Sequence, residues 1–338
     1  MTTAGLTALT ARARGLSTHL LSRPTLELAL AAPDLERLAL LLRDAGLPLA
    51  SGHAVSFEAL ELAARRWAAD KLARLARWLP DGIGIAELLF GDEDRRSARA
   101  MVRGATAGAA ADLRLAGLIP TPRLPERLLK ELARQSSVKS VAALLVAWQH
   151  PLGPGLLAPA TADEPDLFAA ERALGTAHVA ALETASKKVD RGLRAWTAET
   201  IDLENMRTAL QLATRVSADE LTASLHAGGR IPRAWIGEAA GLEALDARVQ
   251  ALAALVPAGP IQDALRRYGI DPVQIDDALL AARLTVLHRR ARLDPLDAVT
   301  VLQFALRLRA QVTILRQAIW RLALGGVPIV PGPLMEVV

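Results

Sequence analysis

Residues 203–210 read Leu-Glu-Asn-Met-Arg-Thr-Ala-Leu, and this stretch has two counterparts elsewhere in the chain. The counterparts are Arg95-Arg-Ser-Ala-Arg99-Ala-Met-Val102 and Val312-Thr-Ile-Leu-Arg316-Gln-Ala-Ile319, which align with it without gaps on a central arginine. The three arginines are 108 and 109 residues apart (207 − 99 and 316 − 207). This regular spacing predicts three copies of one unit of about a hundred residues.

Apolar residues around each arginine recur at intervals of four and three, which keeps them on one face of a helix. A second set of matching segments precedes the arginines, with starts at Asp34, Ser137 and Gly241 that lie 103 and 104 residues apart (137 − 34 and 241 − 137). The alternative is chance similarity within a chain rich in Ala, Leu and Arg. The apolar sets are Ala98, Val102 and Ala105; Met206, Leu210 and Ala213; and Leu315, Ile319 and Leu322.

Helical periodicity extends over nearly the whole chain, because apolar residues recur at three and four and the alternation typical of strands is almost absent. We therefore predict an all-α protein with long helices over residues 295–324 and 165–196. Three copies of one unit predict three similar helical domains, at residues 1–121, 122–232 and 233–338. Three such domains can close around a pseudo-threefold axis and form a ring or funnel with a central concavity.

The composition excludes several classes of protein. The chain has 338 residues, 51% of them hydrophobic, a net charge of +4 and no cysteine, so disulfides and thiolate metal sites are excluded. No stretch approaches the roughly 18 to 20 apolar residues of a membrane-spanning helix, and no signal peptide is apparent. The near balance of charges is not typical of a dedicated nucleic-acid binder.

No catalytic motif is present in the sequence. A Gly-x4-Gly-Lys-Ser/Thr phosphate loop is missing, and the six histidines form no His-Glu-x-x-His motif or close pair. Each histidine is therefore expected to be a surface or capping residue rather than a metal ligand. We predict a non-catalytic protein without a cofactor or metal.

The segment Asp202-Leu-Glu-Asn-Met-Arg207-Thr-Ala-Leu210, followed by Gly228-Gly229-Arg230, resembles the C-type subunit of bacterial and archaeal V/A-type ATP synthases, which is related to the d-type subunit of eukaryotic V-ATPases. The resemblance extends to both other copies and covers essentially the whole chain. It implies a funnel of three similar helical domains that couples the central stalk to the membrane proteolipid ring. Such a rotor component transmits torque between proton transport and ATP synthesis or hydrolysis and performs no chemistry itself.

The same resemblance implies the partners and the location of the protein. The expected partners are the central stalk subunits of the D and F type and the proteolipid ring, with one copy of the chain in each complex. The protein is expected to be peripheral, on the cytoplasmic face of the cell membrane. Nucleic acid is not among the expected partners. The alternative is an all-α regulatory or nucleic-acid-binding scaffold, which is supported only by the arginine content.

The repeated arginines Arg99, Arg207 and Arg316 are candidate structural or interface residues, together with Asn205. An arginine beside an apolar stripe packs its stem at the edge of the core and pairs its head with a carboxylate. Acids five residues earlier on the same helix are poorly placed, so we expect partners from another helix. The alternative role is a direct contact with the rotor or stalk.

A second candidate cluster comprises Arg289, Arg290 and Arg292, within His288-Arg-Arg-Ala-Arg292. Positive side chains near the end of a helix interact favourably with its dipole, which accounts for the cluster without any partner. The alternative is contact with anionic lipid headgroups or with acidic loops of the ring.

Overall fold

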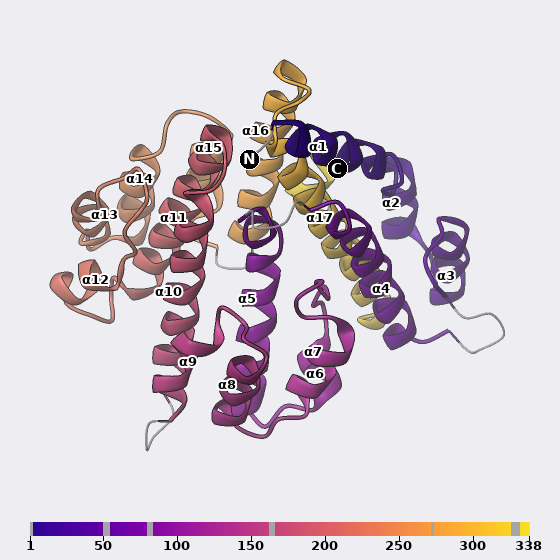
Figure 1. The fold of residues 1–338 in the computed structure, drawn as a ribbon, viewed down its shortest axis with the longest axis horizontal. Coiled ribbons are helices and arrows are strands. Elements are labelled where there is room, and N and C mark those ends of the chain that lie inside the picture. The colour runs from indigo at the N-terminus through magenta and orange to yellow at the C-terminus, as the bar shows by residue number, and fades with distance from the viewer. Residues whose placement is uncertain (1–2, 50–54, 80–83, 162–165, 272–273, 326–331) are drawn as a thin grey trace.

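The computed structural model describes residues 3–49, 55–79, 84–161, 166–271, 274–325 and 332–338. Within these ranges the chain forms seventeen α-helices and one short 3-10 helix, and none of the described residues lies in a strand. The prediction of an all-α protein is confirmed. Figure 1 shows α9–α15 on one side of the molecule, α5–α8 in the middle, and α1–α4 with α17 on the other side.

Three long helical hairpins organise the chain. The first helices of the hairpins start 110 and 108 residues apart (167 − 57 and 275 − 167), and the second helices 106 and 108 (191 − 85 and 299 − 191). These intervals resemble those between the repeated arginines, which all lie on the second helices. The hairpins are α4 (Phe57–Ala76) with α5 (Ile85–Thr106), α10 (Leu167–Ser186) with α11 (Arg191–Leu212), and α16 (Ile275–Leu293) with α17 (Val299–Ala323).

Short helices fill the sequence between the hairpins. Those after α5 are α6 (Ala111–Leu115), α7 (Glu126–Ala133), α8 (Val138–Ala147) and α9 (Gly153–Ala160). Those after α11 are α12 (Ala218–Ser224), α13 (Arg233–Ala240), α14 (Leu245–Ala254) and α15 (Pro260–Tyr268), and each starts 107 residues after its counterpart. Before the first hairpin come α1 (Thr3–Ser17), α2 (Arg23–Ala31) and α3 (Leu35–Asp44), and the 3-10 helix Pro333–Glu336 follows the last.

The second set of sequence matches marks the starts of α3, α8 and α14. Asp34 and Ser137 cap α3 and α8 by accepting backbone N–H groups. The third match lies three residues too early, because α14 begins after Ala244 rather than after Gly241. With this correction the buried positions coincide. They are Leu38, Ala39 and Leu42 in α3; Val141, Ala142 and Leu145 in α8; and Arg248, Val249 and Leu252 in α14.

The predicted boundaries of the two long helices need correction. The segment 165–196 is two helices, because the chain turns after Lys187 and Asp190 caps α11 by accepting the Leu193 N–H at 2.8 Å. No proline or glycine marks this turn in the sequence. The last long helix begins at Val299 instead of residue 295, since Asp294 accepts the Leu296 N–H within a turn.

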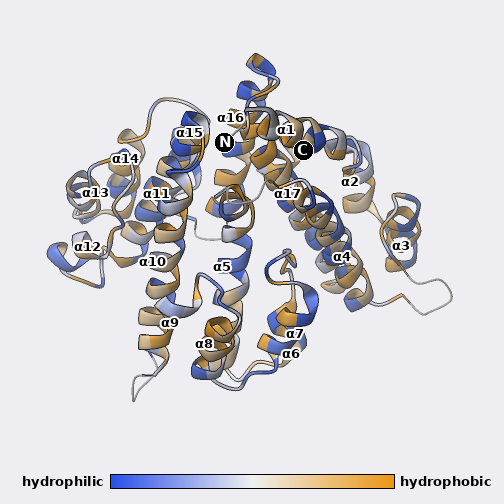
Figure 2. Cartoon of the chain, in the orientation of Figure 1, coloured by the Kyte–Doolittle hydropathy of each residue, from blue (hydrophilic) through white to orange (hydrophobic). Residues whose placement is uncertain are grey.

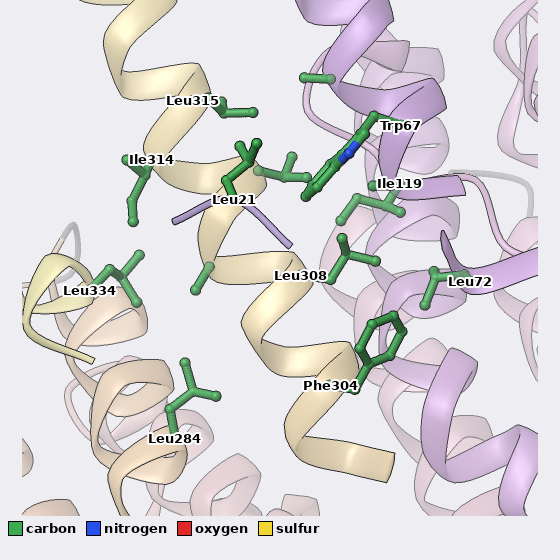
Figure 3. Packing of buried hydrophobic residues seen from close by; sticks show 14 of the residues in the cluster. Leu21, Trp67, Leu72, Ile119, Leu284, Phe304, Leu308, Ile314, Leu315 and Leu334 are labelled. Carbon is green, nitrogen blue, oxygen red and sulfur yellow. The ribbon is translucent and has the colours of Figure 1, made fainter. Parts of the chain in front are cut away.

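Three apolar clusters form the core. The first surrounds α17 and combines residues from both ends of the chain; Figure 3 shows Phe304 and Leu308 of α17 facing Leu72 and Ile119, with Leu284 and Leu334 on its other side. The second cluster joins the later part of α5 to α6–α9 and α10, and the third joins the later part of α11 to α12–α15 and α16. In the second and third clusters, therefore, a long helix is covered by the short helices that follow it.

Candidate functional site

A buried polar residue occupies the same place on each of α5, α11 and α17, five residues before the repeated arginine. These residues are Asp94, Asp202 and Gln311, which are 108 and 109 residues apart (202 − 94 and 311 − 202). None of them pairs with the arginine on its own helix, as expected from the spacing. Each instead holds a distant loop segment against its helix.

Asp94 binds the segment before α7 through side chains. Its Oδ1 accepts the Thr121 hydroxyl at 2.5 Å, and its Oδ2 lies 2.6 Å from the guanidinium of Arg123 and 3.3 Å from Nε2 of His150. The Thr121 oxygen in turn accepts the Leu124 N–H. The carboxylate thereby joins three polar groups in a largely buried site.

Asp202 binds the segment before α13 through the backbone. Its two carboxylate oxygens accept the N–H groups of Arg230 and Ile231, each at 3.1 Å. Burial raises the pKa of Asp202, and these two hydrogen bonds oppose the shift. A Cβ on Gly229 would collide with the carboxylate, so glycine permits the close approach.

Gln311 binds the segment before α2, at the opposite end of the sequence. Its amide accepts the Leu21 N–H at 3.0 Å and donates to the Leu21 carbonyl at 2.8 Å. Residues 290 positions apart are thus fastened together. These hydrogen bonds add to the apolar cluster around α17, which packs the two ends of the chain into one region.

The repeated arginines pair with carboxylates on neighbouring long helices, as the sequence predicted. Arg207 of α11 lies 2.7 Å from Asp276 of α16, and Arg316 of α17 lies 2.9 Å from Glu61 of α4. Arg99 of α5 lies between two carboxylates, 3.7 Å from Glu171 of α10 and 3.9 Å from Glu204 of α11. Asp276, Glu61 and Glu171 each lie within the first five residues of their helix, so the three seams between long helices are alike.

A buried ion pair joins α5 to α11. Arg95 donates to Glu204 at 2.5 Å and to Asp92 at 3.0 Å. Burial alone would raise the pKa of Glu204, but the charges of Arg95, Arg207 and Arg99 outweigh it and hold this pKa well below its usual value. The middle of α5 is coloured hydrophilic in Figure 2, where these charges meet.

Two further sets of contacts connect long helices, one between α17 and α5 and the other between α16 and α11. Arg309 of α17 lies 3.3 Å from Glu93 of α5. Arg283 of α16 lies 3.4 Å above the Trp196 ring and 3.7 Å from Glu199, both of α11. Burial lowers the pKa of Arg283 to about 10, against the opposing charge of Glu199. Sequence inspection missed this network, because no local motif marks a pair between separate helices.

Asn205 has a local structural role. Its side chain donates to the His226 carbonyl at 2.9 Å and accepts the His226 N–H at 2.7 Å. Asn205 therefore fixes the segment after α12 to α11. The equivalent place holds Ser97 in the first copy and Ile314 in the third, so this amide contact belongs to the middle copy.

Two histidines contradict the expectation of surface positions, although His150 has a capping contact, since its Nδ1 accepts the Leu152 N–H at 3.3 Å just before α9. His150 and His178 are both buried, with His150 against Asp94 and the Nδ1 atom of His178 3.8 Å from Glu87. Burial, helped by the charge of Arg95, lowers the pKa of His178 to about 4. His178 is therefore neutral at pH 7.

Nearly the whole chain matches one protein-family model. That model describes the ATP synthase (C/AC39) subunit and covers residues 9–323. The chain belongs to this family. No curated protein matches the sequence. The resemblance to the C-type component of V/A-type ATP synthases is confirmed at the level of the family, and the partners of this C/AC39 family member lie within the ATP synthase complex.

The second candidate cluster of this C/AC39 family member lies at the end of α16. Arg290 pairs with Asp297 at 2.7 Å, whereas Arg289 and Arg292 are exposed. Arg290 and Arg292 lie in the last turn of α16, at the negative end of the helix dipole as predicted, and Arg289 directly precedes this turn. Contact of these residues with a partner stays a prediction.

A groove of about 1080 Å³ runs along α10. Small side chains of α10 line it, with α9 on one side and residues 223–227 on the other. Among the described residues, no group of three His, Cys, Asp or Glu side chains could hold a metal ion. The described helices also include none that is long and apolar enough to cross a membrane.

Proposed function

We propose that this C/AC39 family member is a non-catalytic adaptor of the central rotor, which couples the central stalk to the proteolipid ring of a V/A-type ATP synthase. The observation that carries the proposal is the set of three similar ion-paired seams between long helices, in a chain that the family model matches almost from end to end. Torque passes through a body only if its parts do not slide or unfold locally. The partly exposed seams are supplemented by the more buried pairs of Arg95 with Glu204 and Arg309 with Glu93, which oppose such sliding because separating them leaves charges without partners.

We also propose that the chain is an internal triplication closed around a pseudo-threefold axis. The constant 107-residue offset of the short helices and the places of Asp94, Asp202 and Gln311 support this. A spatial unit then consists of a long helix, the short helices after it and the next long helix, and the third unit combines both ends of the chain. The sequence domains 1–121, 122–232 and 233–338 and the funnel shape stay predictions.

The proposed partners are stalk subunits of the D and F type and the proteolipid ring, with one copy of the chain per complex. The proposed location is the cytoplasmic face of the cell membrane, where the protein is peripheral and its rotation is linked to proton transport in ATP synthesis or hydrolysis. Residues that hold the long helices together act in this function by keeping the adaptor rigid.

Purification of the tagged full-length chain from membranes tests the proposal. The expected result is co-purification of stalk and ring subunits, identified by mass spectrometry. Arg207→Ala, which removes the ion pair between α11 and α16, is expected to lower the stability of the protein more than it weakens binding to the ATP synthase subunits. The matched control is Arg134→Ala, which changes an exposed arginine after α7. Absence of ATP synthase subunits, with salt-sensitive retention of DNA or RNA instead, would overturn the proposal in favour of the scaffold alternative.

A further inference from the structure

The turns of the three hairpins meet at one end of the molecule. A Cβ on Gly84, at the start of α5, would collide with Ala185 in the last turn of α10. A Cβ on Gly192, at the start of α11, would lie 2.7 Å from the guanidinium of Arg290 near the end of α16. The first turn thus adjoins the second, and the second adjoins the third.

Helix α1 closes this group of turns. The guanidinium of Arg12 lies 4.0 Å above the ring of Trp78, just after α4, and Arg14 donates to the Ala291 carbonyl in α16 at 3.0 Å. The end of the molecule formed by the three turns and α1 is called the turn face below. In Figure 1 the end of α16 projects at the top of the view, beyond α1.

Exposed basic residues dominate the turn face. Six of them lie in or next to the three turns, two at each, and Arg74 among them also pairs with Asp70 of α4 at 2.8 Å. The acids nearest the second and third turns, Asp190, Asp294 and Asp297, each accept a backbone N–H, and Asp297 also pairs with Arg290. The exposed basic residues are Arg74 and Arg77, Lys187 and Lys188, and Arg289 and Arg292.

Large apolar side chains project among these charges. Leu293 is 87% exposed and Leu296 is 60% exposed, both at the turn between α16 and α17, and Trp78 is 51% exposed beside the first turn. Leu293 is the most exposed large apolar residue among the described ones. Apolar tips surrounded by Arg and Lys match the interface of an anionic bilayer, where the tips enter the headgroup region and the cations contact phosphates.

We propose that the turn face binds anionic phospholipid headgroups, with Leu293 and Leu296 inserted between them and Arg289 and Arg292 paired with phosphate. The proposal rests on the proposed function only for the presence of a membrane near the protein. It adds an orientation, since the turn face then points to the membrane and the short helices α6–α9 point away. An acidic protein surface is the competing occupant, but it gains less from separate leucines that no groove shelters.

Co-sedimentation of the full-length protein with phospholipid vesicles tests the proposal. Vesicles of equal phosphatidylcholine and phosphatidylglycerol are expected to bind the protein at about 0.1 M salt, and vesicles of phosphatidylcholine alone are not. Arg289→Glu with Arg292→Glu should weaken binding about 30-fold or more, because each lost basic contact accounts for roughly a fivefold change. Leu293→Ser with Leu296→Ser should weaken binding about tenfold.

Matched controls lie on α6 and α7, which pack against the later part of α5, about 25 Å from its start at about 1.5 Å per residue. Leu113→Ser removes an exposed leucine, and Arg127→Glu with Arg134→Glu reverses two exposed arginines. Both controls should bind vesicles like the unchanged protein. Circular dichroism and thermal unfolding establish that the variants fold.

Three outcomes would overturn the proposal: failure to bind anionic vesicles, equal binding by the turn-face variants, or equal loss in the controls. A different result would identify an acidic protein surface as the partner of the turn face. In that case the unchanged protein does not bind vesicles, and the turn-face variants no longer co-purify with ring subunits. Failure of the proposed function is a separate result, because co-purification with ATP synthase subunits does not depend on vesicle binding.

Discussion

Helices α5 and α11 carry an aspartate at the same place and satisfy it in different ways. Asp94 on α5 is bound by the side chains of Thr121, Arg123 and His150, whereas Asp202 on α11 is bound by two backbone N–H groups. Both hold the segment that leads into the next short helix. The fold therefore requires a buried acceptor at this position, while the chemistry of its partners is interchangeable.

The third long helix extends this comparison to a residue without charge. Gln311 on α17 performs the same fastening with a neutral amide. A charge at this place is therefore not required by the architecture. The cost of removing each residue should depend on what it leaves unpaired, which the following predictions test.

The largest effect is expected for Asp94→Ala. This change removes one of the two carboxylates that pair with Arg123, the other being Glu87 at 2.5 Å, and it also removes the acceptor of Thr121 and the partner of His150. The free energy of unfolding should therefore fall by about 3 kcal/mol. Urea unfolding monitored by circular dichroism measures the loss. A loss of stability smaller than that of Asp202→Ala would contradict the explanation that charged partners make Asp94 the more costly residue to remove.

The second largest effect is expected in the pH dependence of stability, which should differ between the region beside α5 and the equivalent region beside α11. His178, beside α5, has a pKa lowered to about 4, whereas the position 108 residues later (178 + 108) is Val286. The unfolded chain binds the proton more readily, so stability falls as pH drops from about 6.5 towards 4, by at most about 3 kcal/mol. Urea midpoints across this range should drop less in His178→Val, and an unchanged slope would contradict this role of His178.

A smaller loss is expected for Asp202→Ala. Two backbone N–H groups lose their acceptor, but no charge is stranded, so the free energy of unfolding should fall by about 1 to 3 kcal/mol. Hydrogen exchange should accelerate at Arg230 and Ile231 before the rest of the protein. Uniform acceleration over the whole chain would show that this contact is not a local fastening.

The smallest effect is expected at the seam between α11 and α16. Arg207 is partly exposed and pairs with a partly exposed Asp276, so Arg207→Ala should lower the free energy of unfolding by only about 1 kcal/mol. Thermal unfolding of this variant beside Arg134→Ala, which should change stability by less than about 0.5 kcal/mol, provides the comparison. A variant that melts like the control yet loses the stalk would assign Arg207 to the interface instead.

Parts of the fold are accessible from sequence because they depend on neighbouring residues. Helical periodicity predicted the class, and the repeated arginines predicted partners on other helices. The turn after Lys187 was missed because it contains no proline or glycine. The start of a new helix there is recognised only from the structure, in which Asp190 caps α11. The Arg95 and Glu204 pair was missed because its members lie 109 residues apart on separate helices.

Local sequence patterns are enough to specify an all-α chain with a repeat spacing and a family, since helix formation depends on residues close together in the chain and each copy of the repeat is recognised from a short segment. Which polar residues fasten which segments depends on tertiary packing. Asp94, Asp202 and Gln311 share a place but not a residue type, so their equivalence becomes visible when their distant partners are known. The joining of Leu21 to Gln311 across nearly the whole chain is the clearest case, because a contact between two ends leaves no mark on either segment alone.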